Sequence, residues 1–226
     1  MKSALTALLT ICLCWGVGCS KNLSEFQKIK AKAMLGDADA QRSLAQRYYY
    51  GLGVEKDFKK AAKWQRKAAD QGWKVAQHNL GFMYARGLGV QQDFKEAVKW
   101  NRKAADQGYK NAQYSLGLAY DDGQGVQQDF KEAVTWYRKA ADQGYAKAQY
   151  KLGVMYDNGE GVLEDYVTAY AWWNIAAANG SKSAKDNKPK IANDMTPEQI
   201  AKAEELLIEM VKKNPKLLRD PKYPKY

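Results

Sequence analysis

The side chains that most often carry out chemistry are scarce in this chain of 226 residues. It has one histidine, His78, and its three cysteines, Cys12, Cys14 and Cys19, all lie near the N-terminus. A histidine works as a general base when a neighbouring group orients it, and the sequence offers no such group for His78. Nucleophile elbows and histidine pairs at metal-binding spacing are also missing. We therefore expect no enzyme activity, no cofactor and no metal site.

The elements that position the side chains follow from a repeat of 36 residues. Trp64, Trp100, Trp136 and Trp172 are separated by this interval. The segment Gly-Val-Gln-Gln-Asp-Phe-Lys-Glu-Ala-Val starts at Gly89 and occurs again 36 residues later. Self-similarity at such a period indicates stacked units, in which each unit contacts its neighbours in the chain.

Each unit is expected to contain two helices joined by a glycine-rich turn. In the second unit Ala76, Leu80 and Tyr84 are spaced by four residues, which puts them on one face of the first helix. Gly81 follows the leucine, and the absence of a side chain there lets a neighbouring helix approach closely. Gly87 is expected to end this helix in the left-handed conformation, which glycine adopts at low cost.

The second helix of each unit is expected to begin at an aspartate. Asp93 with Glu96, and Asp129 with Glu132, fit the capping-box pattern. In a capping box each of the two side chains accepts a hydrogen bond from the backbone N–H of the other residue. The helix then continues to the glycine that opens the next unit.

This pattern resembles the Sel1-like repeat, a relative of the tetratricopeptide repeat. The matching residues of the second unit are Ala76, Leu80, Gly81, Tyr84, Gly87, Gly89, Val90, Asp93, Ala97, Trp100, Lys103, Ala104, Ala105 and Gly108. The resemblance implies an all-α fold, a right-handed α-solenoid of helix–turn–helix repeats. It also implies an adaptor role in protein complexes. Many bacterial members of the family are exported and take part in host or envelope interactions.

The repeats and their ends divide the chain into segments. The expected segments are residues 1–19 as a signal peptide of the lipoprotein type, 20–35 as an N-terminal capping helix, 36–71, 72–107, 108–143 and 144–179 as four repeats, 180–213 as a degenerate repeat with a C-terminal capping helix, and 214–226 as a basic tail with prolines. Pro189 is expected to end a helix, and Thr196 to cap the final one. Residues 215–226 are expected to be extended, as a loose end or as a recruitment motif.

Positions that differ between repeats are the candidates for binding, because framework positions must be alike for the units to stack. On the first helices Arg42, His78, Tyr114 and Tyr150 occupy equivalent positions, and Phe82 lies one turn after His78. Aromatic residues and arginine are enriched at protein interfaces. We expect these five side chains to face solvent and form a protein-binding groove. The alternative is that some of them pack between adjacent first helices.

Residues 1–19 are predicted to be an export signal, with Lys2 as its positive end and an apolar run over residues 4–13. The segment from Gly16 to Cys19 resembles the lipobox of bacterial lipoproteins, although Gly16 stands where that motif usually has leucine. Lipidation of Cys19 would attach the chain to a membrane, and Ser20 after it points to the outer membrane. Ordinary cleavage near Gly18 would instead give a free periplasmic or secreted protein.

The formal net charge is +11, a value that can favour nucleic acids, anionic membranes or acidic proteins. The lysines are spread through every repeat and often stand beside acids, as in Lys95–Glu96 and Lys131–Glu132. This distribution indicates a solvated helix surface, with an acidic partner or a polyanionic envelope component as the alternative. Nucleic acid is not expected as a partner, because an exported protein meets little of it.

The sequence therefore predicts an exported protein-binding scaffold or adaptor that uses the concave face of the solenoid. Its expected partner is another protein. One alternative is a secreted virulence-type factor that acts on host proteins. A second alternative is a β-lactam-binding or β-lactam-hydrolysing enzyme, because cysteine-rich relatives of the family are linked to that activity. The disulfide-paired helices of those relatives are absent here.

Overall fold

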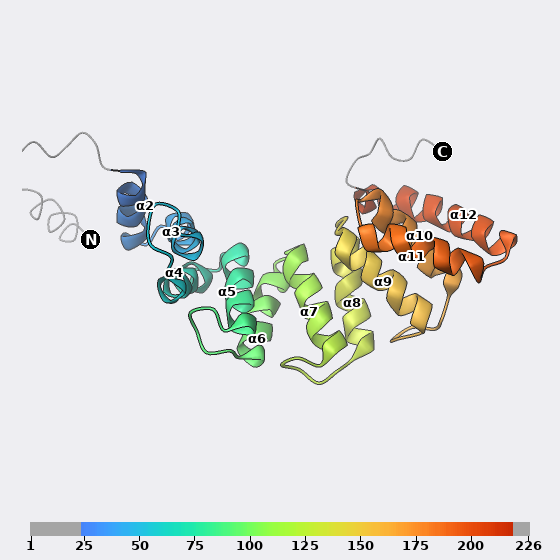
Figure 1. Ribbon diagram of the computed structural model, residues 1–226, viewed down its shortest axis with the longest axis horizontal. Helices are drawn as coiled ribbons and strands as arrows, with labels where there is room; N and C mark the ends of the chain where they lie inside the picture. Colours follow the sequence, from blue (N-terminus) through green and yellow to red (C-terminus); the bar gives the residue numbers. More distant parts are fainter. Residues whose placement is uncertain (1–23, 219–226) are drawn as a thin grey trace, which may run out of the picture.

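The computed structural model describes residues 24–218, and in this range it contains eleven α-helices, one 3-10 helix and no strand (Figure 1). The elements are α2 (Glu25–Met34), α3 (Ala38–Tyr50), α4 (Phe58–Asp70), α5 (Lys74–Arg86), α6 (Phe94–Asp106), α7 (Lys110–Asp122), α8 (Phe130–Ala141), α9 (Ala146–Asn158), α10 (Tyr166–Ala178), α11 (Lys182–Asn193), α12 (Pro197–Lys213) and η1 (Pro215–Leu217). The all-α class predicted from the sequence is confirmed. The predicted leader, Cys19 and residues 219–226 lie outside the described residues.

Consecutive helices pack in pairs, and the pairs stack into an elongated, curved array (Figure 1). Within the repeats α3 packs on α4, α5 on α6, α7 on α8 and α9 on α10, and each second helix also packs on the first helix of the next pair. The helix α2 stands ahead of α3 in the place of a second helix, while α11 and α12 both pack on α10. The described residues therefore form an α-solenoid.

The aspartate at the start of each second helix caps it, but the predicted capping boxes do not form. Asp93 accepts a hydrogen bond from the backbone N–H of Glu96 at 3.0 Å, as expected. The backbone N–H of Asp93 donates to the carbonyl of Tyr84 at 3.0 Å, so no free donor remains for the Glu96 carboxylate. Glu96 instead pairs with Lys99 at 2.8 Å. The expectation for Asp129 and Glu132 is wrong for the same reason, because the backbone N–H of Asp129 donates to the carbonyl of Tyr120.

In the second, third and fourth repeats the second glycine of the glycine pair has a role between repeats that the sequence pattern did not reveal. Gly87 ends α5 in the left-handed conformation with a φ of 64°, as predicted. Gly89 also has a positive φ, of 71°, and a Cβ atom there would overlap the carbonyl group of Phe58, at the start of α4 in the preceding repeat. Gly125 and Gly161 meet Phe94 and Phe130 in the same way. The turns of these three repeats thus pack directly against the backbone of the preceding repeat.

Replacing Gly125 with alanine should destabilise the fold more than the same change at Gly108. Their φ values are 77° and 76°, so both substitutions carry the same left-handed strain of about 1–2 kcal/mol. A methyl group at Gly108 meets nothing within 4 Å, whereas at Gly125 it overlaps the Phe94 carbonyl. We expect Gly125→Ala to lower the free energy of unfolding by at least about 1 kcal/mol more than Gly108→Ala. Urea unfolding of both variants measures this difference, and equal losses would contradict the contact.

Buried amide side chains connect successive helix pairs. Gln77 donates to the carbonyl of Ala69 at 3.2 Å, and Gln107 of the same repeat donates to the Gln77 amide oxygen at 2.8 Å. An amide buried without partners would cost about 1–3 kcal/mol, so these bonds offset the burial of the glutamines. The full set of pairs is Gln41–Gln71, Gln77–Gln107, Gln113–Gln143 and Gln149–Asn179.

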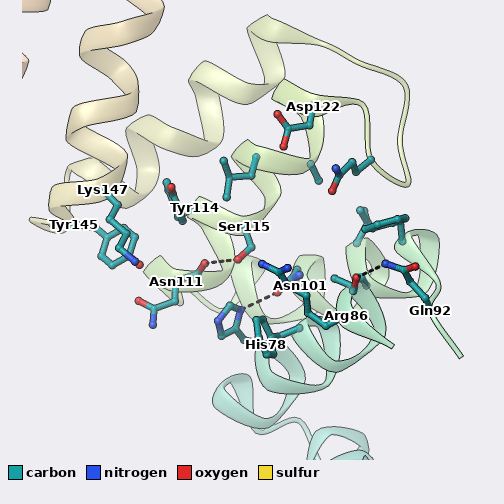
Figure 2. A pocket seen from close by; sticks show the side chains of 18 residues that line it. His78, Arg86, Gln92, Asn101, Asn111, Tyr114, Ser115, Asp122, Tyr145 and Lys147 are labelled. Carbon is teal, nitrogen blue, oxygen red and sulfur yellow. Dashed lines mark hydrogen bonds between the residues drawn. The ribbon is translucent and has the colours of Figure 1, made fainter. Parts of the chain in front are cut away.

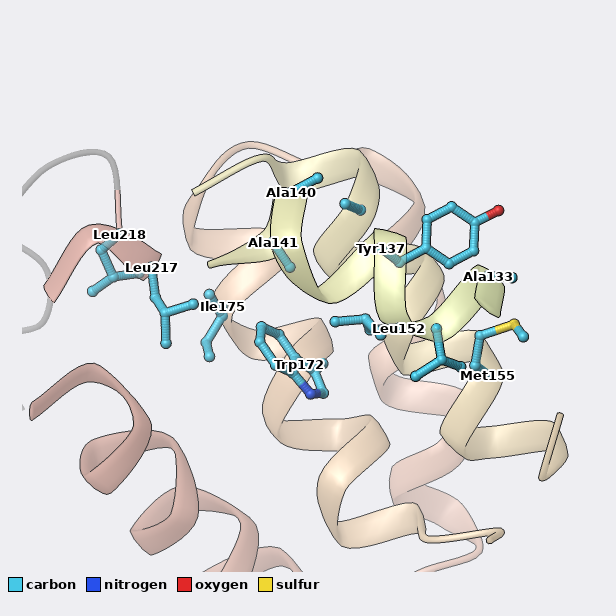
Figure 3. Packing of buried hydrophobic residues seen from close by; sticks show 12 residues of the cluster. Ala133, Tyr137, Ala140, Ala141, Leu152, Met155, Trp172, Ile175, Leu217 and Leu218 are labelled. Carbon is cyan, nitrogen blue, oxygen red and sulfur yellow. The ribbon is translucent and has the colours of Figure 1, made fainter. Parts of the chain in front are cut away.

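The start of the predicted tail is part of the core, which corrects the expectation of an extended segment from residue 215. Leu217 and Leu218 are only 2% and 9% exposed and lie in the same cluster as Trp172 and Ile175 (Figure 3). The carbonyl of Leu217 accepts hydrogen bonds from Gln149 at 2.8 Å and from Asn179 at 2.6 Å. This segment therefore closes the last amide pair, where no further repeat follows.

Pro189 does not end its helix, contrary to the sequence prediction. The helix α11 runs through it to Asn193. Ala184 and Ile191, on either side of the proline, are 0% and 4% exposed and pack into a cluster with residues of α10. The burial of these apolar groups offsets the backbone hydrogen bond that proline cannot make.

Candidate binding groove

A hollow lies between α5, α6 and α7 and reaches the start of α9 (Figure 2). Its volume is about 800 Å³. The lining contains the apolar side chains of Phe82, Phe94, Val98 and Leu118 together with several amides and charged groups. We call this hollow the α5–α7 groove.

The groove coincides with a repeat in which one position of the second helix holds an amide instead of a ring. This position directly follows the repeated tryptophan, and it faces the residue after the buried leucine of the first helix. A Cβ atom at Gly117 or Gly153 would overlap the ring that stands opposite, whereas at Gly81 it would approach the Asn101 amide at 2.9 Å. The facing pairs are Ala45 with Gln65, Gly81 with Asn101, Gly117 with Tyr137, and Gly153 with Trp173.

The large rings of the later repeats occupy the space that Asn101 leaves open. Tyr137 and Trp173 are 0% and 3% exposed. Asn101 is 7% exposed and lines the groove, although sequence reasoning missed it because only first helices were searched for variable positions. One repeat position holds Gln65, Asn101, Tyr137 and Trp173 in turn, and this variation could have identified Asn101 from the sequence.

His78 is largely buried at the groove, whereas the sequence led us to expect a surface side chain. Its Nδ1 atom lies 2.9 Å from Oδ1 of Asn101 (Figure 2). Its ring also meets Tyr109 edge to face, at 5.4 Å between centroids. Burial lowers the pKa of His78, and this outweighs the hydrogen bond with Asn101, which raises it. The imidazole is therefore neutral at neutral pH and can exchange hydrogen bonds with a bound segment.

Tyr114 and Phe82 also line the groove, and they differ in how much surface they offer. The Tyr114 ring packs against Tyr137 and Tyr145, with centroids 5.8 Å and 5.3 Å apart, and burial raises its pKa to about 12. Phe82 is 42% exposed and also lines an adjoining hollow of about 310 Å³ toward α3. His78 and Phe82 thus form a ridge shared by the two hollows.

The two remaining predicted residues do not line the α5–α7 groove. Tyr150 stacks on Trp173 with centroids 6.2 Å apart, and its hydroxyl accepts a hydrogen bond from Asn187 at 2.9 Å. This is the packing between helices that the sequence left as an alternative. Arg42 pairs with Asp39 of its own helix at 2.8 Å.

The rim of the groove carries charges that have no ion-pair partner within residues 24–218. These are Arg86 at the end of α5, Asp122 at the end of α7 and Lys147 at the start of α9 (Figure 2). Two cations and one anion around an apolar floor suit the binding of a peptide better than the catalysis of a reaction. In the described part of the chain no cluster of three or more histidines, cysteines or acids could bind a metal ion.

The repeats match the Sel1 repeat family over residues 38–73, 74–109, 110–145 and 146–181. The protein therefore belongs to the Sel1 repeat family, whose members are typically non-catalytic scaffold proteins and whose repeats generally mediate protein–protein interaction. A comparison with curated protein sequences gave no match.

Solved structures of Sel1 repeat proteins have the same architecture. The protective antigen c5321 of uropathogenic Escherichia coli, with an SLR fold, is 38% identical with a TM-score of 0.79, over 95% of this chain and 46% of that one. A Sel1 repeat protein from Oxalobacter formigenes is 33% identical with a TM-score of 0.71, over 84% and 80% of the two chains. The immunity protein Pa5087 of Pseudomonas aeruginosa shares the fold alone, at 24% identity and a TM-score of 0.53, over 91% and 81%. The present chain thus spans less than half of c5321.

The buried position of His78 predicts a pH dependence of stability. Because burial lowers its pKa in the folded state, the unfolded chain binds a proton more readily than the folded chain below the ordinary pKa of 6.5. Acidification from about pH 7.5 to about pH 5.5 should therefore lower the free energy of unfolding. His78→Gln should reduce this loss, because the chain has no other histidine. Urea unfolding at the two pH values measures it, and an equal loss in both proteins would disprove the assignment.

Proposed function

We propose that the protein is a scaffold whose α5–α7 groove receives a segment of a partner protein. The observation that carries the proposal is the groove itself, an uncovered hollow of about 800 Å³ where Asn101 replaces the rings of later repeats. Protein-binding sites combine an apolar floor with a polar rim, and this hollow has both. The general role of Sel1 repeats in protein–protein interaction supports the proposal.

The side chains of the groove suit a short extended segment. Phe82, Phe94 and Leu118 offer apolar surface to the side chains of a partner. Amides such as Asn101 and Gln124 can bond a partner backbone, which presents an N–H and a carbonyl at each residue. Arg86 and Lys147 favour an acidic residue in that segment, since neither has an ion-pair partner in residues 24–218.

A single substitution can fill the groove with a side chain that the fold already accepts elsewhere. Asn101→Tyr faces Gly81 as Tyr137 faces Gly117, so the new ring should take the same place without unfolding the repeat. A photoreactive residue at Phe82 should crosslink to a partner in the original chain. We expect Asn101→Tyr to reduce that adduct at least about tenfold, the effect of losing roughly 1.4 kcal/mol of binding.

Thr135→Tyr is the matched control, because it adds the same ring at an exposed position of α8 outside the groove. It should leave the adduct unchanged. Circular dichroism and urea unfolding should show that both variants remain folded. An undiminished adduct in folded Asn101→Tyr would remove the groove as the binding site.

We further propose that the protein is exported and held at a membrane through a lipid on Cys19. The pattern of residues 1–19 supports this proposal, and so does the likeness to c5321. An antigen that protects must be accessible to the immune system, which favours export of the related chain. A free periplasmic or secreted protein is the second candidate, supported by glycine at position 16 in place of leucine.

Growth with labelled palmitate distinguishes an anchored from a released protein. We expect the chain to take up the label, Cys19→Ala to lose it, and Cys14→Ala to retain it, because only Cys19 follows the lipobox-like segment. Loss in both variants, or no label in the original chain, would contradict lipidation. Unlabelled protein in the medium would then support the secreted candidate.

A further inference from the structure

Three second helices share a row of lysines, spaced by four residues on α4 and α6 and by eight on α8, where Thr135 takes the middle position. This spacing places successive members on one side of a helix. All of these lysines are exposed, and we call the surface that they form the outer face. The members are Lys59, Lys63 and Lys67 on α4, Lys95, Lys99 and Lys103 on α6, and Lys131 and Lys139 on α8.

The outer face keeps most of its charge without compensation. Among the eight lysines only Lys99 forms an ion pair within residues 24–218, with Glu96 at 2.8 Å. The three helices contain twelve lysines and arginines against four acids, whereas α5, α7 and α9 contain five against three. Like charges one turn apart destabilise a helix, so the rows are not a stabilising device.

Tryptophans lie beneath the lysines but do not add an exposed aromatic surface. The ammonium groups of Lys103 and Lys139 lie 4.3 Å and 3.9 Å from the ring centroids of Trp100 and Trp136. These rings are only 3% and 5% exposed. The cation–π contacts therefore hold the lysine side chains along the surface, with their charges still open to solvent.

The lysine row stops where the chain covers its own second helix. On α10 the equivalent positions are Val167, Ala171 and Ile175. Ala171 and Ile175 are fully buried, and α12 packs on this helix. The lysines thus coincide with the part of the second-helix layer that is left open in residues 24–218.

The composition of the outer face suits a lipid surface better than a protein or a nucleic acid. Protein interfaces are enriched in arginine and aromatic residues and depleted in lysine. Single-stranded nucleic acids bind to exposed aromatic rings, and here Trp100 and Trp136 are buried and Trp64 is partly buried beneath Lys67. The two hollows beside His78 are lined by none of these lysines. A bilayer of anionic lipids requires only a broad set of cations, and each lysine near it adds attraction.

We propose that the outer face of α4, α6 and α8 binds the surface of an anionic phospholipid bilayer. The proposal rests on the membrane attachment proposed above, because an acyl chain and a basic patch together anchor a protein where either alone binds weakly. Four residues lie between Cys19 and Ser24, the cap of α2, and the five residue-to-residue steps can span at most about 18 Å. A lipid on Cys19 would therefore hold the basic end of the solenoid close to the bilayer.

Vesicle sedimentation of the full chain carrying Cys19→Ala tests the outer face without the lipid. We expect this protein to bind vesicles rich in phosphatidylglycerol, to ignore vesicles of phosphatidylcholine, and to dissociate as salt is raised. Adding Lys59→Gln, Lys63→Gln, Lys95→Gln and Lys99→Gln should lower binding at least about tenfold. These four lysines do not stack on tryptophan, so their replacement should leave the fold intact.

The matched control removes the same charge from exposed lysines of α11 and α12, by Lys182→Gln, Lys185→Gln, Lys190→Gln and Lys212→Gln. It should change binding much less. An equal loss in both variants, or equal binding to both kinds of vesicle, would overturn the proposal. So would binding to polyglutamate beads without binding to vesicles, which would assign the face to an acidic protein. Lipidation is tested separately by palmitate labelling, so either proposal can fail alone.

Discussion

The stacking of this solenoid depends on close backbone contact between successive repeats. The second glycine of each turn, such as Gly125, lies so near the carbonyl of Phe94 that no side chain fits between them. Buried amides then add hydrogen bonds across the same joints, as between the Gln77 amide and the carbonyl of Ala69 in the preceding repeat. Because the glycine contact recurs at all three joints between the four repeats, with the amide bonds beside it, the two fix the position of one helix pair on the next, and the framework residues have little freedom left for function.

The candidate groove results from one side chain set against that fixed framework. The helices around Asn101 pack as those around Tyr137 do, and the first helix offers a glycine in both repeats. An amide in place of a ring leaves a hollow with His78 at its side. In the same framework the lysines of α4, α6 and α8 form the outer face. The helix α12 covers only the next second helix, α10. The candidate binding surfaces therefore arise at positions outside the framework that the repeats share.

The sequence predicted the helices and their order well, because its signals are local. The face carrying Leu80, the cap at Asp93 and the stop at Gly87 each depend on residues within a few positions of one another. The candidate site was harder to predict. Variation between repeats indicated His78, Phe82 and Tyr114, which line the groove, but it also indicated Tyr150, whose ring packs on Trp173. Equivalent positions of the first helices have different surroundings, because the facing residue of the second helix is Asn101 in one repeat and Trp173 in another.

By itself the sequence determined the repeat, the all-α class and the helix starts and stops within the four repeats, since periodicity and capping act over one or two turns of chain. Tertiary structure alone decided which variable side chains remain open, because that depends on partners about 20 residues away or more, such as Asn101 for Gly81. It also decided that Leu217 closes the array instead of beginning a loose tail. That segment is polar in composition, but its Leu217 carbonyl accepts hydrogen bonds from Gln149 and Asn179, and its two leucines cover an apolar surface of the last repeat.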